Sequence, residues 1–142
     1  MGIDIRQDTF SEDDYRRFND KIRHNLQALQ QLLLRPGFGM GDDSLGAELE
    51  FYLVDNKGNP APCNLAILKQ ANNPQLTPEL NQFNLEYNLQ PQPFAGSPFA
   101  AFEQELSSAI TATDHIAAGH GAELLPIGIL PTAQPSQFGP HM

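Results

Sequence analysis

Two segments of the sequence alternate strictly between apolar and polar residues, and this alternation restricts the fold more than any other feature. The segments are GAELEFYLVD (46–55) and FNLEYNLQ (83–90). Successive side chains of a β-strand point to opposite faces of its sheet, so each segment predicts a strand with one buried face. The apolar positions are Leu49, Phe51, Leu53, Phe83, Leu85, Tyr87 and Leu89. The polar positions are Glu48, Glu50, Tyr52, Asn84, Glu86, Asn88 and Gln90.

A helical pattern precedes the first of these strands. Ser11 and Asp14 have the spacing of a capping pair, and Pro36 with Gly37 ends the pattern. Apolar residues recur between these points at the spacing of one helical face, which predicts a buried stripe. The stripe consists of Tyr15, Phe18, Ile22, Leu26, Leu29 and Leu33.

A second helix is expected after the second strand. Ser97 is placed to cap it, Pro98 suits the first helical position, and a glycine at 119 or 121 ends it. Its predicted buried positions are Phe99, Phe102, Leu106, Ile110 and Ala117. The apolar run AELLPIGIL (122–130) then predicts a third strand, interrupted by a proline and a glycine.

The order of these elements predicts an α+β fold, in which a mostly antiparallel sheet carries helices on one face. We expect residues 1–142 to form a single domain. A sheet of three strands leaves two open edges, and the run at 122–130 is apolar enough to need a neighbour. We therefore expect an N-terminal fragment of a larger catalytic domain, and a homo-oligomer formed through the open edges.

The composition excludes several classes of partner. The chain has 17 Asp and Glu against 8 Lys and Arg, a net charge of −9, which argues against nucleic acid and anionic membrane surfaces. No apolar run approaches the roughly 20 residues of a membrane span. The single cysteine, Cys63, forms no internal disulfide, which is typical of the cytoplasm.

Glutamates on the polar face of the two strands suggest a metal site. If both strands belong to one sheet, Glu48, Glu50 and Glu86 project from the same side. Carboxylate oxygens are hard ligands, and several of them at one place suit Mg²⁺ or Mn²⁺. The alternative is a solvated polar face, with Glu79 as a simple loop charge. Asn88 flanks Glu86, where it could orient a carboxylate or a ligand.

No catalytic residue can be assigned from the sequence. The four histidines are scattered without the spacing of a zinc site, and only His120, between two glycines, stands out. The glycines of GFGMG (37–41) follow no strand and precede no Lys-Ser/Thr pair, so they predict no phosphate loop.

Three segments together resemble the glutamate–cysteine ligase superfamily, most closely its bacterial carboxylate–amine ligase branch, often called the second glutamate–cysteine ligase type. They are GAELEFYLVD, PELNQFNLEYNLQPQPF and AAGHGAELLPIGILPT, and the resemblance covers roughly residues 40–132. It implies a sheet related to that of glutamine synthetase, with the active site on the concave polar face. It also implies that Glu48, Glu50 and Glu86 bind the metal, and that Glu79 is a further acidic contributor to the site. We expect Glu79, and Asn88 from its place beside Glu86, to contact the cofactor.

The resemblance further implies an enzyme that depends on ATP and Mg²⁺ (or Mn²⁺). Such an enzyme forms an acyl phosphate on a glutamate-like carboxylate, and a cysteine-like amine then attacks it, as in glutathione biosynthesis. The chain departs from the family pattern in its cations, because Lys57 and Lys69 are its only Lys or Arg residues after Arg35. We therefore expect the isolated chain to be inactive. The rival hypothesis is a non-catalytic α+β module that binds a partner strand along an open sheet edge.

Overall fold

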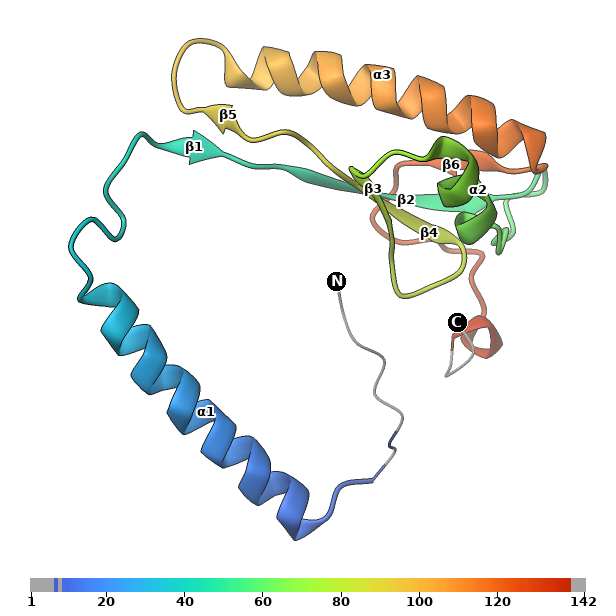
Figure 1. Cartoon of the computed structure of the whole chain (residues 1–142). Coiled ribbons are helices and arrows are strands. Elements are labelled where there is room, and N and C mark those ends of the chain that lie inside the picture. The colour runs from blue at the N-terminus through green and yellow to red at the C-terminus, as the bar shows by residue number, and fades with distance from the viewer. Residues whose placement is uncertain (1–6, 8, 139–142) are drawn as a thin grey trace. The chain divides into compact units, whose positions relative to one another are not determined.

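The computed structural model describes residue 7 and residues 9–138. The chain divides into two compact units, Gly2–Asp42 and Asp43–Met142, which are described separately. Figure 1 shows the helices and strands of both units with their labels. That residues 1–142 form a single domain, and that this domain is a fragment of a larger one, both stay predictions.

The first unit contains the helix α1 (Glu12–Leu33). Its N-terminus has the predicted capping box, in which the Ser11 hydroxyl accepts from the Asp14 N–H and the Asp14 carboxylate accepts from the Ser11 N–H. These bonds satisfy donors that the first helical turn leaves free. The helix ends at Leu33, before the predicted stop at Pro36.

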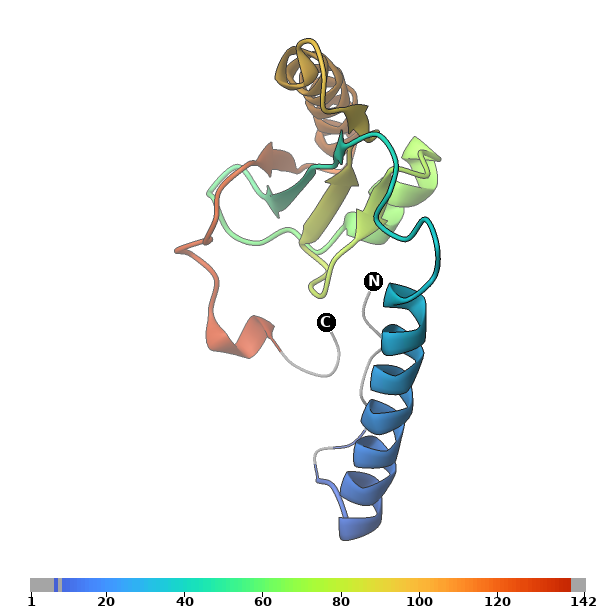
Figure 2. The same ribbon diagram turned by 90° about the vertical axis from the view of Figure 1, so that its left-hand side faces the viewer.

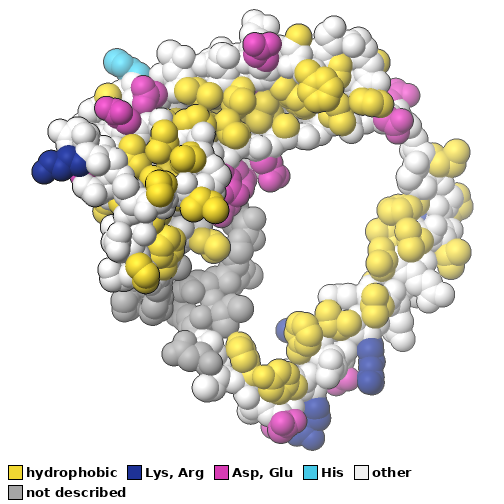
Figure 3. Space-filling view, turned by 180° about the vertical axis from the view of Figure 1, so that it is seen from behind, with side chains coloured by type: hydrophobic (Ala, Val, Ile, Leu, Met, Phe, Trp, Pro, Cys, Tyr) yellow, Lys and Arg dark blue, Asp and Glu magenta, His cyan; other side chains and the backbone are white. Residues whose placement is uncertain are grey.

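The apolar stripe of α1 is not buried, so this prediction is wrong for the unit described here. No residue of α1 is buried, and the stripe ranges from 42% exposed at Ile22 to 62% at Phe18. Figure 3 shows apolar side chains in yellow along this helix. Periodicity identifies the face of a helix that favours burial, but a single helix offers no second surface to cover it.

The second unit is built on an antiparallel sheet of four strands in the order β3-β4-β2-β6. The strands are β3 (Leu76–Pro78), β4 (Asn84–Asn88), β2 (Glu48–Val54) and β6 (Glu123–Leu125). Two short strands, β1 (Ser44–Leu45) and β5 (Gln92–Pro93), form a separate antiparallel pair. The helices of this unit are α2 (Asn64–Ala71), α3 (Pro98–Gly119) and a 3-10 turn, η1 (Pro135–Gln137). The predicted α+β class with an antiparallel sheet is confirmed.

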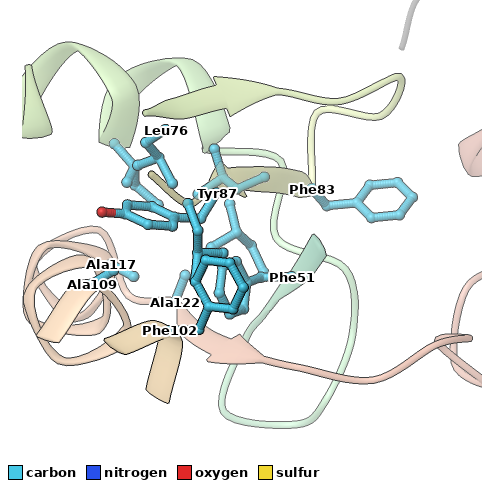
Figure 4. Packing of buried hydrophobic residues seen from close by; sticks show 12 residues of the cluster. Phe51, Leu76, Phe83, Tyr87, Phe102, Ala109, Ala117 and Ala122 are labelled. Atoms are coloured by element: carbon cyan, nitrogen blue, oxygen red, sulfur yellow. The ribbon is translucent and has the colours of Figure 1, made fainter. Parts of the chain in front are cut away.

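The core of this unit lies between the sheet and the helices α2 and α3. Phe51 and Leu53 from β2 and Leu85 and Tyr87 from β4 point to one face, as the alternation predicts. They pack against residues of both helices, whose largest members are Ile67 and Phe102. Figure 2 shows the two helices beside the sheet, and Figure 4 shows Phe51, Tyr87 and Phe102 packed together. The opposite face of the sheet is left free for polar side chains.

The predicted apolar stripe of α3 is correct except at its first position. Phe102 and Ala117 are buried, and Leu106 and Ile110 pack against the core, but Phe99 is 73% exposed. Phe99 is the second residue of the helix and follows the β5–α3 loop. Pro98 occupies the first turn as expected, whereas the side chain of the preceding serine makes no capping bond.

The third predicted strand, 122–130, is too long. Within this run only Glu123–Leu125 form a strand, β6, which pairs with β2. The last pair of residues in this ladder is Leu125 with Tyr52. Pro126 follows at once and has no N–H to donate to a neighbouring strand, so the ladder stops there. Ile129 is exposed beyond it, and Leu130 returns to a buried position.

Phe83 precedes the first residue of β4 and is buried in the core cluster, as predicted, but its ring turns toward Tyr52. Its ring stacks on Tyr52, with ring centroids 6.3 Å apart, and meets Phe138 edge-on at 5.7 Å. Figure 4 shows the Phe83 ring pointing away from Phe51 and Phe102.

Candidate metal centre

The register of the sheet brings Glu50 and Glu86 together. In the antiparallel pair of β2 and β4, Glu50 lies directly opposite Glu86. On the other side of β4, Thr77 of β3 is also opposite Glu86. Directly opposed side chains of neighbouring strands lie on the same face, so Glu86 stands between Glu50 and Thr77.

Glu79 joins these two glutamates from the end of β3. One carboxylate oxygen from each of Glu50, Glu79 and Glu86 lies within 4.8 Å of the other two. Glu50 is exposed, and the other two are half-buried. We call these three residues the carboxylate triad. Among the residues described, no other group of three His, Cys, Asp or Glu side chains comes together in this way.

Glu48 lies outside the triad. It is two residues before Glu50 on β2 and stands opposite Asn88. It is exposed and borders a separate open hollow, which Gly46, Ala47 and Pro91 also line. Of the three residues that the sequence predicts as metal ligands, the structure therefore brings Glu50 and Glu86 together and leaves Glu48 at a different position on the same face.

Asn88 and Thr77 hold the carboxylate of Glu86. Asn88 Nδ2 donates to Glu86 Oε1 at 2.6 Å, and Thr77 Oγ1 donates to the same oxygen at 3.3 Å. Asn88 Nδ2 also lies 3.2 Å from Thr77 Oγ1, to which it donates. Asn88 therefore orients Glu86, one of the two roles that the sequence suggests for it; contact with a cofactor stays a prediction.

The pKa values of Glu79 and Glu86 shift in opposite directions. The pKa of Glu79 is raised, first because its carboxyl is hydrogen-bonded to that of Glu86 and then through partial burial and the nearby charges of Glu86 and Glu50. The pKa of Glu86 is lowered. Partial burial acts to raise this pKa, but hydrogen bonds from Glu79, Asn88 and Thr77 together outweigh that effect. Of these two carboxyls, Glu79 is therefore the one that is protonated more readily as the pH falls.

The donor set of the triad fits a hard divalent cation. All three groups offer carboxylate oxygens, which suit Mg²⁺ and Mn²⁺ better than zinc or copper. A small pocket of about 240 Å³ opens beside them, lined by Thr77, Glu79, Glu86 and Asn88 among others. A cation bound here would offset the mutual repulsion of these carboxylates.

Other titratable groups of this unit serve the fold. The carboxylate of Glu105 on α3 accepts from Gln75 Nε2 at 2.7 Å and from the Gln90 N–H at 3.1 Å. His120 Nε2 lies 2.9 Å from Gln70 Oε1 on the surface. Burial raises the pKa of the Cys63 thiol.

Sequence reasoning missed Thr77 because it missed β3. This strand has three residues and includes Pro78, so it is too short to show alternation and contains a residue that disfavours strands. The dipeptide Pro78-Glu79 gives no signal of its own. Only the structure shows that Glu79, one residue beyond the last pair of β3 and β4, lies beside Glu86.

The fold and the site define an α+β protein in which helices cover one sheet face and a candidate divalent-cation site occupies the other. In the described part of the chain, no helix is both long enough and apolar enough to cross a membrane. The model of glutamate-cysteine ligase family 2 (GCS2) matches residues 44–142, which is more than half of the chain. The chain therefore belongs to this family, and the predicted superfamily is confirmed.

The matched residues include the whole carboxylate triad and exclude α1. No curated protein matches the chain. No solved structure matches it either, so a relation of its sheet to that of glutamine synthetase stays a prediction.

Proposed function

We propose that the carboxylate triad forms part of the Mg²⁺–ATP site of a carboxylate–amine ligase. The observation that carries this proposal is that three carboxylate oxygens gather within 4.8 Å on the polar face, inside the region that matches the glutamate–cysteine ligase family. Like charges repel, so their convergence is unfavourable in the metal-free chain and becomes favourable with a cation.

Each residue of the site has a distinct part in this proposal. Glu50, Glu79 and Glu86 hold Mg²⁺ or Mn²⁺, and Asn88 keeps the Glu86 carboxylate turned toward the site. The cation supplies positive charge for the phosphate oxygens of ATP. Glu48, from its place opposite Asn88, is free to bind a further cation or another part of the substrates.

The proposed reaction joins a glutamate-like carboxylate to a cysteine-like amine. The carboxylate oxygen attacks the γ-phosphorus of ATP, which gives an acyl phosphate and ADP. The amine nitrogen then attacks the acyl carbon, phosphate leaves, and an amide forms with loss of a proton. Reactions of this kind depend mainly on positioning and charge neutralisation.

The described residues offer few cations for the phosphates. After Arg35 the sequence has only Lys57, in the turn after β2, and Lys69, on α2. We therefore propose that the isolated chain binds the cation without turnover, and that further basic groups, or a second copy paired along β3 or β6, complete the site.

Binding of Mn²⁺ to the chain tests this proposal directly. Isothermal titration of the wild-type chain with MnCl₂ is compared with Glu86→Gln and Glu50→Gln, which keep the shape of the side chain and remove the charge. The matched control is Glu103→Gln, an exposed glutamate on α3. We expect saturable binding in the wild type and the control, and its loss in both triad variants.

The rival hypothesis, a module that binds a partner through its sheet edge, predicts a different outcome. It expects no Mn²⁺ binding above that of the triad variants and no stabilisation by the cation. Equal binding in the wild type, Glu50→Gln and Glu86→Gln therefore contradicts the metal site and leaves the interaction module as the better description.

A further inference from the structure

The position of Glu79 is not set by strand pairing. The ladder between β3 and β4 ends at the pair Pro78 and Leu85, so Glu79 lies one residue beyond its last rung. The turn that follows, residues 79–83, leads back into β4 and so to Glu86. Whatever holds this turn therefore decides how close Glu79 comes to Glu86.

Asn64, the first residue of α2, binds this turn through three donors. Its side-chain Nδ2 donates to the carbonyl oxygens of Asn81 at 2.9 Å and Asn84 at 3.1 Å. Its backbone N–H donates to the carbonyl oxygen of Gln82 at 3.1 Å. The Asn64 side chain is only 4% exposed, so these bonds are shielded from water and expensive to break.

The Asn64 side chain is not used to cap its own helix. The N-cap position of α2 belongs to Cys63, whose side chain makes no capping bond. The two donors of the Asn64 amide instead reach residues 17 and 20 positions further along the chain. The buried side-chain amide of Asn64 therefore stabilises the β3–β4 turn and not the N-terminus of its own helix.

We propose that Asn64 is a positioning residue for the cation site, because it fixes the turn that carries Glu79 beside Glu86. The proposal rests on the proposed function of the triad. Repulsion among the triad carboxylates pushes the turn away from the sheet, and the strand ladder does not extend far enough to oppose it. The bonds from Asn64 oppose it from α2, which packs on the opposite, apolar face of the sheet.

The test measures Mn²⁺ affinity in Asn64→Leu, which has a similar volume and no donor. Loss of a residue that orients metal ligands typically weakens metal binding by about 10–100-fold, and we expect at least about tenfold here. The matched control is Ile67→Val, which removes one buried methylene from the same helix without touching the turn. We expect the control to lose thermal stability while its Mn²⁺ affinity stays at the wild-type value.

A second measurement needs no metal. The Asn84 N–H donates to the Asn81 carbonyl at 3.1 Å inside the turn. Hydrogen exchange of this amide is expected to become faster in Asn64→Leu, whereas the exchange of the buried Leu85 amide changes no more than in the control. If Asn64→Leu fails to fold, Asn64→Ser is measured in its place, since its hydroxyl is too short to reach both carbonyls.

The outcomes separate the two proposals. Wild-type Mn²⁺ affinity in a folded Asn64 variant overturns the positioning role and leaves the metal site intact. Equal loss of affinity in Asn64→Leu and Ile67→Val also overturns it, because general destabilisation then explains the result. Absence of Mn²⁺ binding in the wild-type chain overturns the proposed function, and the role of Asn64 with it.

Discussion

Replacing Glu79 by glutamine should stabilise the metal-free chain at neutral pH. Glutamine keeps the size of the side chain and can donate a hydrogen bond to Glu86, as the protonated carboxyl of Glu79 does. It cannot carry the negative charge that repels Glu86 and Glu50. The substitution therefore removes the repulsion and keeps the favourable contact.

The size of this effect follows from the spacing of the triad. Two unit charges 4.8 Å apart repel by about 0.9 kcal/mol in water. Glu79 faces two such charges, but it is only half-buried, and salt and solvent screen the interaction. We expect Glu79→Gln to raise the free energy of unfolding by about 1 kcal/mol at pH 7, or Tm by about 4–8 °C for a unit of this size.

The pH dependence of stability independently checks the sign of the change that Glu79→Gln makes to the free energy of unfolding. Because the pKa of Glu79 is raised in the folded chain, its contribution to stability is present at low pH. This contribution is lost as the pH rises from the ordinary glutamate pKa of about 4.3 through the raised pKa of Glu79. Glu86, with its lowered pKa, acts in the opposite sense: its contribution is lost as the pH falls. The gain from Glu79→Gln should therefore vanish near pH 3.5 and be complete by pH 7.

The assay is thermal unfolding, followed by circular dichroism at several pH values in the presence of a metal chelator. The matched control is Glu103→Gln, at an exposed position of α3. An equal gain at pH 3.5 and pH 7, or none at pH 7, would refute the electrostatic reasoning. Addition of Mg²⁺ should reverse the order of stability, so that the wild type becomes more stable than Glu79→Gln. The wild type gains about 1.4 kcal/mol at a cation concentration ten times its Kd, and Glu79→Gln gains less.

Two further predictions concern the fold that supports the site. Leu85→Ala, at a fully buried position of β4, should reduce the free energy of unfolding by about 2–5 kcal/mol in denaturant titrations, and a loss below 1 kcal/mol contradicts the burial described here. Glu105→Ala should cost about 1–3 kcal/mol, because it removes the charged acceptor of the Gln90 N–H and one of the two acceptors of Gln75 Nε2. Stability equal to the wild type would show that this carboxylate is solvated.

The sequence alone determined the faces of the two main strands. Strict alternation placed Phe51 and Leu85 on the buried side and Glu50 and Glu86 on the polar side, since a period of two admits no other assignment. The start of α1 was equally readable, because the capping box of Ser11 and Asp14 acts through bonds to adjacent backbone. Pro98 also fell in the first turn of α3, where its fixed φ suits a helix, although the predicted cap at Ser97 does not form.

Only the tertiary structure decided which residues of a face meet. Alternation is unchanged when a strand slides by two residues, so it could not show that Glu50, rather than Glu48, stands opposite Glu86. Glu79 joins the triad from the turn just beyond the short strand β3, and neither this strand nor the turn leaves a periodic signal in the sequence.

Burial also depended on tertiary contacts. Asn64 is polar, yet it is buried because the turn of a distant hairpin offers it three acceptors. The stripe of α1 is apolar, yet it is exposed within its own unit because a lone helix has no surface to pack against. A sequence pattern indicates whether a side chain favours burial or solvent. The fold decides whether a packing surface or a hydrogen-bond partner is present to bury it.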